Sequence, residues 1–111
     1  LKQLMILATH CSTFFLLFFE VRYCFNKIYK MNFYVYILET NRNSRRITYT
    51  GYTKNLFKRI DLHNLGKGAK FTRGNFWKLI YKKKFSTKNE AIKYEYLIKK
   101  KRSLKLKLIN K

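Results

Sequence analysis

Hydrophobic and polar positions alternate with a period of two along the segment Asn32–Glu39, which reads NFYVYILE. Aromatic and β-branched residues in so short a run are typical of a β-strand. With this period Tyr34 and Tyr36 share one face of the strand, and the other face carries Phe33, Val35 and Ile37. The pattern therefore predicts a strand here, then a turn over residues 41–45 and a hairpin partner over residues 46–51.

The period changes after Gly51, which breaks the second strand. Thr53 or Asn55 can cap a helix that runs to about Asn64, since both side chains accept hydrogen bonds from free backbone N–H groups at a helix start. Residues 65–68 (LGKG) then predict a flexible basic turn. A helix is thus expected between the second and third strands.

The segment Trp77–Phe85 (WKLIYKKKF) predicts the third strand, and its three consecutive lysines favour an edge position. Thr87 and Glu90 are spaced as a capping box, which predicts a helix to about Arg102, followed by a short basic helix over residues 104–109. The intervening helix prevents a tight turn between the second and third strands. The expected fold is therefore α/β (α+β), a small three-stranded antiparallel or mixed sheet flanked by helices.

Residues 1–30 are apolar but irregular, and we expect them to form an extension outside a single folded domain of residues 31–111. Their apolar run, residues 14–19, is far shorter than the ~20 residues that span a bilayer. No small-x-small cleavage site follows the run, so a signal peptide is not favoured and we expect a cytoplasmic protein. A membrane tether is the alternative function for this segment.

The charge of the chain indicates its partner. There are 26 basic and 5 acidic residues, a net charge of +21; without residues 1–30, 22 basic and 4 acidic residues remain. Such a chain repels itself unless a polyanion neutralises it, which favours nucleic acid, with an anionic membrane surface as the rival. A hydrophobic content of 47% is too high for a disordered basic tail. Cys11 and Cys24 show no metal-like spacing, so no zinc site or disulfide framework is predicted.

Two residues of the first predicted helix are candidates for phosphate chemistry. Arg59 and His63 are four residues apart, so they lie on one face of that helix. A guanidinium can hold two phosphate oxygens, and an imidazole can donate a hydrogen bond beside it. The alternative explanation is a solvated arginine and a surface histidine in a lysine-rich helix.

Glu95 is a carboxylate on the apolar side of the later helix, together with Ala91, Tyr94 and Ile98. A lone carboxylate at the edge of a core is costly unless it is paired or holds a cation. Two explanations stay open: an ion pair with Arg59, or coordination of a hard cation such as Mg²⁺ by one carboxylate, waters and a substrate phosphate.

The loop over residues 66–73 (GKGAKFTR) mixes glycine, cations and an aromatic residue. This composition suits contact with a phosphate backbone and stacking on a base, so we assign Lys67, Lys70 and Arg73 to nucleic-acid binding. A generic flexible basic loop would have a similar composition. The loop is not a Walker motif, because it lacks GK[ST].

Taken in order, these residues resemble the GIY-YIG nuclease superfamily. Tyr34-Val35-Tyr36 is similar to its first motif and Tyr49-Thr50-Gly51 to its second. The helix-borne Arg, the His four residues later and the metal-binding Glu of the family fall on Arg59, His63 and Glu95. The resemblance covers about residues 32–109 and is to the small single-domain bacterial members, related to the nuclease domain of the excision-repair endonuclease C subunit. Each triplet alone is unspecific, whereas the ordered set with these spacings is specific.

The resemblance implies a metal-dependent DNA endonuclease that uses Mg²⁺ or Mn²⁺, with a role in DNA repair or recombination. It implies that Glu95 holds the ion and that Arg59 neutralises charge growing on the phosphate. Tyr36 would deprotonate or orient the attacking water, with Tyr49 and His63 completing the hydrogen-bond network. An unperturbed phenol, with a pKa of about 10, is a poor base at neutral pH, and neighbouring cations would have to ease its ionisation.

The alternative function is a non-catalytic, basic nucleic-acid-binding protein that keeps the same fold. Salt-sensitive binding does not separate it from a nuclease, because backbone contacts produce that sensitivity in both. DNA is the expected partner, a membrane is not favoured, no small-molecule cofactor is expected, and the oligomeric state stays open.

Overall fold

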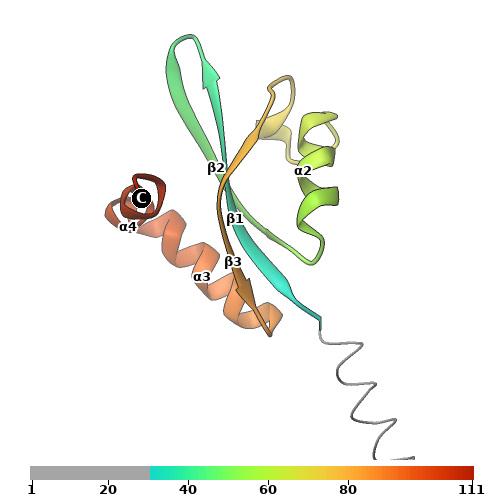
Figure 1. Ribbon diagram of the computed structural model, residues 1–111, viewed down its shortest axis with the longest axis vertical. Helices are drawn as coiled ribbons and strands as arrows, with labels where there is room; N and C mark the ends of the chain where they lie inside the picture. The colour runs from blue at the N-terminus through green and yellow to red at the C-terminus, as the bar shows by residue number, and fades with distance from the viewer. Residues whose placement is uncertain (1–30) are drawn as a thin grey trace, which may run out of the picture. The chain divides into compact units, whose positions relative to one another are not determined.

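A three-stranded antiparallel sheet forms the centre of the domain (Figure 1). The structure is a computed structural model that describes residues 31–111, and the expectations for residues 1–30, an extension or a membrane tether, lie outside the described residues. The strands are β1 (Phe33–Arg42), β2 (Arg45–Thr53) and β3 (Lys78–Phe85), arranged in the order β2-β1-β3. The sheet is therefore wholly antiparallel, and β3 is an edge strand as predicted.

The hairpin between β1 and β2 has a two-residue turn, Asn43 and Ser44, whose φ angles are both positive, 51° and 61°. Positive φ at both central positions is the geometry that matches the twist of an antiparallel hairpin. The resulting register places Tyr36 opposite Gly51 and Leu38 opposite Tyr49. Both motifs of the resemblance thus lie side by side on neighbouring strands.

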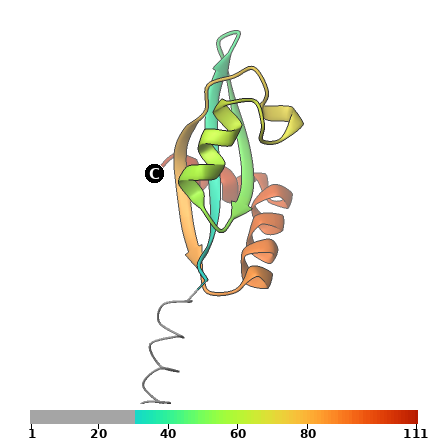
Figure 2. The ribbon, with the colours of Figure 1, turned by 90° about the vertical axis from the view of Figure 1, so that its right-hand side faces the viewer.

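The alternation along β1 gives the sheet two buried faces, each with its own core. Helix α2 (Leu56–Asn64) covers one face, whose buried residues are Tyr36, Leu38, Leu56 and Trp77. Helices α3 (Lys88–Lys100) and α4 (Arg102–Ile109) cover the other face, whose buried residues are Phe33, Val35, Ile37, Ala91 and Ile98. Figure 2 shows α2 in front of the sheet and α3 behind it, toward the edge formed by β2. The predicted division of the first strand into two faces is confirmed.

The helix starts follow the predicted caps. The side chain of Asn55 accepts a hydrogen bond from the Lys58 backbone at the start of α2, and that of Thr87 accepts one from the Glu90 backbone at the start of α3. Helix α3 ends at Lys100, two residues earlier than predicted. A short 3₁₀ helix, η1 (Lys70–Thr72), lies in the basic loop. Within residues 31–111 no helix has the length and apolarity needed to cross a bilayer.

Candidate active site

A buried hydrogen bond joins the sheet to α2. The phenol oxygen of Tyr36 lies 2.8 Å from Nε2 of His63, and both residues are 0% exposed. Strand alternation directs Tyr36 to the face that α2 covers, and His63 is one of the two buried residues of that helix. The interpretation of His63 as a surface residue is therefore wrong.

The second ring nitrogen of His63 bonds to the loop after α2. Nδ1 lies 2.7 Å from the hydroxyl of Thr72, which itself donates to the carbonyl of Ala69 at 2.8 Å. A hydroxyl has one proton to donate, so Thr72 must accept from Nδ1–H of His63. In the neutral imidazole the lone pair is then on Nε2, and we assign Tyr36 as the donor to it. Tyr36 therefore donates to His63 and His63 donates to Thr72, an arrangement that we call the proton order.

The pKa values of Tyr36 and His63 agree with a hydrogen bond between two uncharged groups. Burial raises the pKa of Tyr36 to about 12, although the hydrogen bond from Arg59 opposes the shift. Burial also lowers the pKa of His63, and the positive charge of Arg59 lowers it further. At neutral pH the phenol therefore keeps its proton and the imidazole is uncharged.

Arg59 lies where this buried pair meets the surface. Its Nε donates a long hydrogen bond, 3.4 Å, to the phenol oxygen of Tyr36, and this bond is the main reason that the pKa of Arg59 is raised. The residue is half-buried, so it is not the fully solvated arginine of the alternative explanation. A guanidinium in this position stabilises a negative charge on the phenol oxygen and can also face an incoming phosphate.

Tyr49 forms an aromatic wall beside His63. The centroids of the two rings are 4.9 Å apart, and the Tyr49 ring is 6.4 Å from that of Tyr36. On its other side Tyr49 stacks with the exposed ring of Phe71 at 6.4 Å and an interplanar angle of 22°. The structure thus brings the predicted Tyr36, Tyr49, Arg59 and His63 together in one cluster.

Two glycines leave room for this cluster. A Cβ atom at Gly51 would lie 2.7 Å from the phenol oxygen of Tyr36, and one at Gly68 would overlap the imidazole of His63. Real Cβ atoms do not approach other atoms so closely. The final residue of the second motif therefore has a steric reason to be glycine.

Glu95 approaches from α3, on the other face of the sheet. Its carboxylate pairs with Nζ of Lys99 at 2.7 Å, one helical turn away, and its side chain is only 16% exposed. The alternative of an ion pair with Arg59 is therefore wrong. The Glu95 charge still lies near enough to Tyr36 to raise the pKa of the phenol, as the smallest of five causes.

The residues around Glu95 limit the kind of metal site. Residues 31–111 contain no group of three His, Cys, Asp or Glu side chains that could hold a metal ion. A single, largely buried carboxylate fits a hard cation such as Mg²⁺, which keeps most of its waters and takes further oxygens from a substrate phosphate. The donor set is compatible with that ion and unsuited to zinc, which prefers three or four protein ligands.

The basic loop is anchored to the site by a residue that sequence reasoning missed. Lys67, Lys70 and Arg73 are exposed, whereas Thr72 between them is 0% exposed and bonds to His63. The indole of Trp77 fixes the same turn, because its Nε1 donates to the Thr72 carbonyl at 2.8 Å. A threonine in a basic loop gives no sequence signal for this role.

Comparison with known proteins decides the family. The profile described as GIY-YIG catalytic domain matches residues 32–108. This chain belongs to the GIY-YIG family. The matched range contains both tyrosine motifs, α2 and Glu95, so the GIY-YIG assignment covers the whole cluster described above.

Similar proteins are small bacterial ones. A UPF0213 protein of Oceanobacillus iheyensis is 51% identical over 78 residues, which are 68% of this chain and 87% of the relative. A UPF0213 protein of Clostridium perfringens is 52% identical over 79 residues, 69% of this chain and 82% of the relative. The solution NMR structure of a UPF0213 protein from Bacillus halodurans is 41% identical, covers 72% of this chain and 84% of that chain, and gives a TM-score of 0.44. GIY-YIG membership places the chain in a nuclease family that acts on nucleic acid.

Proposed function

We propose that this GIY-YIG domain hydrolyses phosphodiester bonds of DNA as an endonuclease assisted by Mg²⁺ or Mn²⁺. The observation that supports the proposal most is the hydrogen-bond chain from Tyr36 through His63 to Thr72, because it gives the phenol a place to send its proton. The excess of cations in residues 31–111 supplies the attraction to a polyanion, which all backbone-binding proteins share.

The hydrogen-bond chain from Tyr36 to Thr72 compensates for the weakness of the phenol as a base. As the Tyr36 oxygen takes a proton from the attacking water, its own proton passes to Nε2 of His63. The water oxygen forms a bond to phosphorus, the bond from phosphorus to the leaving oxygen breaks, and the leaving oxygen takes a proton from solvent. Thr72 holds the resulting imidazolium by accepting from its Nδ1–H.

Arg59 has opposing effects on this transfer, and the substrate reverses the unfavourable one. Its charge stabilises a phenolate on Tyr36 but lowers the pKa of His63. A phosphodiester anion beside Arg59 offsets the effect of the Arg59 charge on His63. The pKa of the imidazole then rises, and its protonation becomes easier. Bound substrate therefore makes the proton path more favourable than it is in the free protein.

Glu95 would hold the divalent cation, which when bound supplies positive charge for the leaving oxygen. The carboxylate must first be released by Lys99, its partner in the structure. Lys99 is exposed on α3 and has a flexible side chain, so it can turn away without disturbing the helix.

The test is cleavage of nicked, flapped and branched DNA, and of the matching RNA, with and without Mg²⁺ or Mn²⁺. We expect metal-dependent cleavage of DNA, and a rate lower by about 100-fold or more in Glu95→Gln with DNA binding retained. Glu90→Gln is the matched control, because it removes an exposed carboxylate from the same helix.

Three outcomes would refute parts of the proposal. Salt-dependent binding without cleavage of any substrate would favour the non-catalytic binding protein. Equal rates in Glu95→Gln and Glu90→Gln would remove Glu95 from the reaction. Faster cleavage of RNA would change the substrate class, whereas a preference for nicked or branched DNA would support a role in repair or recombination.

A further inference from the structure

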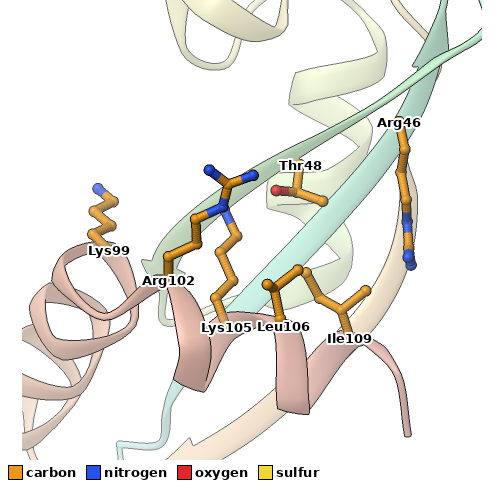
Figure 3. Close-up of a pocket in the computed structure, with 7 residues that line it drawn as sticks. All are labelled: Arg46, Thr48, Lys99, Arg102, Lys105, Leu106 and Ile109. Atoms are coloured by element: carbon orange, nitrogen blue, oxygen red, sulfur yellow. The ribbon is translucent and has the colours of Figure 1, made fainter.

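A basic pocket lies between β2 and the two C-terminal helices, on the face of the sheet that α3 and α4 cover. Its volume is about 370 Å³, and no acidic side chain lines it. The lining residues are the cations Arg46, Lys99, Arg102 and Lys105, together with Thr48, Leu106 and Ile109 (Figure 3). Nothing in the proton path through Tyr36 and His63 uses this pocket.

Two of the four cations lack a counter-charge. Arg46 pairs with Glu39, and Lys99 with Glu95, whereas Arg102 and Lys105 make no ion pair with any side chain of residues 31–111. Figure 3 shows both of these side chains rising from α4 toward Thr48 on β2. Burial lowers the pKa of Lys105, and the neighbouring charge of Lys99 lowers it further.

The chemistry of the lining fits a phosphate group. A guanidinium fork, an ammonium and a hydroxyl converge on one small volume, and all three donate to phosphate oxygens. The apolar side chains of Leu106 and Ile109 line the same pocket, and an apolar wall strengthens a charge–charge interaction beside it. A pocket of this size holds one phosphate and its waters rather than a duplex.

Lys99 connects this pocket to the candidate active site. The same ammonium that lines the pocket contacts the carboxylate of Glu95. A strand whose scissile phosphate lies beside Glu95 therefore has neighbouring phosphates within reach of Lys99 and the pocket, since each strand of a duplex carries one phosphate per ~3.4 Å of helix axis.

We propose that Arg102 and Lys105 bind a second backbone phosphate of the nucleic acid, on the strand that is cleaved. Occupancy of this pocket fixes the direction in which the strand crosses the domain. The identity of the ligand as nucleic acid rests on the proposed function, whereas the preference of the pocket for a phosphate rests on its own residues.

The first test compares two double variants that each lose two positive charges. Arg102→Gln/Lys105→Gln empties the pocket of its unpaired cations. Lys84→Gln/Lys88→Gln is the control, because both lysines are exposed and neither lines this pocket, and Lys84 lies opposite Tyr34, at the far end of β1. Affinity for duplex DNA is measured against KCl concentration in EDTA, so that no cleavage is required.

The expected result is a salt dependence that is flatter by about 0.9 in log–log slope in the pocket variant for each lost phosphate contact. The control variant should keep the slope of the original protein. Equal slopes in the two variants would overturn the proposal, because the pocket cations would then act only through net charge.

A second test locates the phosphate and does not depend on a folded variant. Methylphosphonate linkages, which carry no charge, are introduced one at a time into the DNA. The unmodified protein should bind more weakly to the DNA that carries the methylphosphonate at one particular linkage. The side-chain NMR signals of Arg102 and Lys105 should not respond to this modified DNA. Loss spread evenly over all linkages, or signals that respond unchanged to every modified DNA, would refute the site.

A titration with inorganic phosphate separates the two sources of the ligand. If inorganic phosphate binds weakly, shifts the NMR signals of Arg102 and Lys105 and is displaced by DNA, the result supports a backbone phosphate as the ligand. If inorganic phosphate saturates the pocket and DNA does not displace it, the proposal is overturned. The results also distinguish the two proposals. If one methylphosphonate linkage weakens binding through Arg102 and Lys105 but no DNA is cleaved, the pocket is supported and the nuclease proposal is refuted. If DNA is cleaved in a metal-dependent reaction but no single linkage has this effect, the nuclease proposal is supported and the pocket is refuted.

Discussion

Thr72→Val replaces the hydroxyl that ends the buried proton path by a methyl group of similar size. The hydroxyl accepts from Nδ1–H of His63 and donates to the carbonyl of Ala69, and Thr72 is fully buried. Valine keeps the shape and supplies neither interaction. The variant therefore tests the assigned proton order without changing the charge of the protein.

The size of the effect follows from the groups that lose their partner. The Nδ1 atom of His63 is left buried without a hydrogen-bond partner in either tautomer, which costs about 1–3 kcal/mol. The Ala69 carbonyl still accepts a hydrogen bond from the backbone N–H of residue 72, at 3.1 Å in the structure, so it adds little. A domain of this size loses about 4–8 °C in Tm for each kcal/mol.

The assay is thermal and denaturant unfolding, with Thr50→Val as the matched control. Thr50 is 3% exposed, and its hydroxyl has no hydrogen-bond partner among the described residues. Replacing an unpaired buried hydroxyl by a methyl should be neutral or stabilising. A free-energy loss of about 1–3 kcal/mol in Thr72→Val beside no loss in Thr50→Val is the expected result.

Catalysis and NMR provide the second measurement. Without an acceptor for Nδ1–H, His63 should carry its proton on Nε2 and no longer accept from Tyr36, which should lower the cleavage rate by about 100-fold. Nitrogen chemical shifts of the imidazole report the tautomer. An unchanged tautomer together with an unchanged rate would refute the proton order assigned here.

Three further predictions concern neighbouring positions. Arg59→Lys keeps the charge but loses the fork, so single-turnover cleavage should fall by about 100-fold while DNA affinity stays nearly constant; near-original rates would exclude Arg59 from the reaction. Gly51→Ala should displace the phenol of Tyr36, lowering both the rate and, by about 1–3 kcal/mol, the free energy of unfolding, and a crystal structure with an unmoved phenol would contradict this. Because the folded-state pKa of His63 is lowered, the unfolded chain binds more protons and stability should fall as the pH drops below about 6.5, a fall that denaturant titrations should find reduced in His63→Gln.

Features of the fold that depend on local patterns could be predicted from the sequence. Strand alternation gave the two faces of β1, and the capping side chains of Asn55 and Thr87 gave the helix starts. The strand order could not be predicted, because the pairing of β1 with β3 joins segments separated by a helix and a loop. Nor does any local pattern indicate the register shift in that pairing between Ile37 and Leu38.

Some features of the candidate site could likewise be predicted from the sequence, and others could not. The spacing of Arg59 and His63 predicted a shared helix face, and both lie beside Tyr36. Thr72 was missed because its role depends on the path of a loop. The partner of Glu95 was visible in the sequence, since Lys99 follows it by one helical turn, a spacing that favours a pair of opposite charges.

The proposed function assigns binding and chemistry to different residues of this domain, which is why charge alone cannot identify a nuclease. Exposed cations such as those of the basic loop attract a polyanion over a distance, but they transfer no proton. The pair formed by Tyr36 and His63 is buried and neutral, so it adds nothing to that attraction. A variant such as Thr72→Val should therefore leave the salt dependence of binding intact while it slows cleavage, and Arg102→Gln/Lys105→Gln should change the salt dependence while the buried path persists. Because the Tyr36–His63 pair is fully hydrogen-bonded and adds nothing to the attraction, the cleavage rate of Thr72→Val, and not its affinity for DNA, separates the nuclease from the non-catalytic alternative.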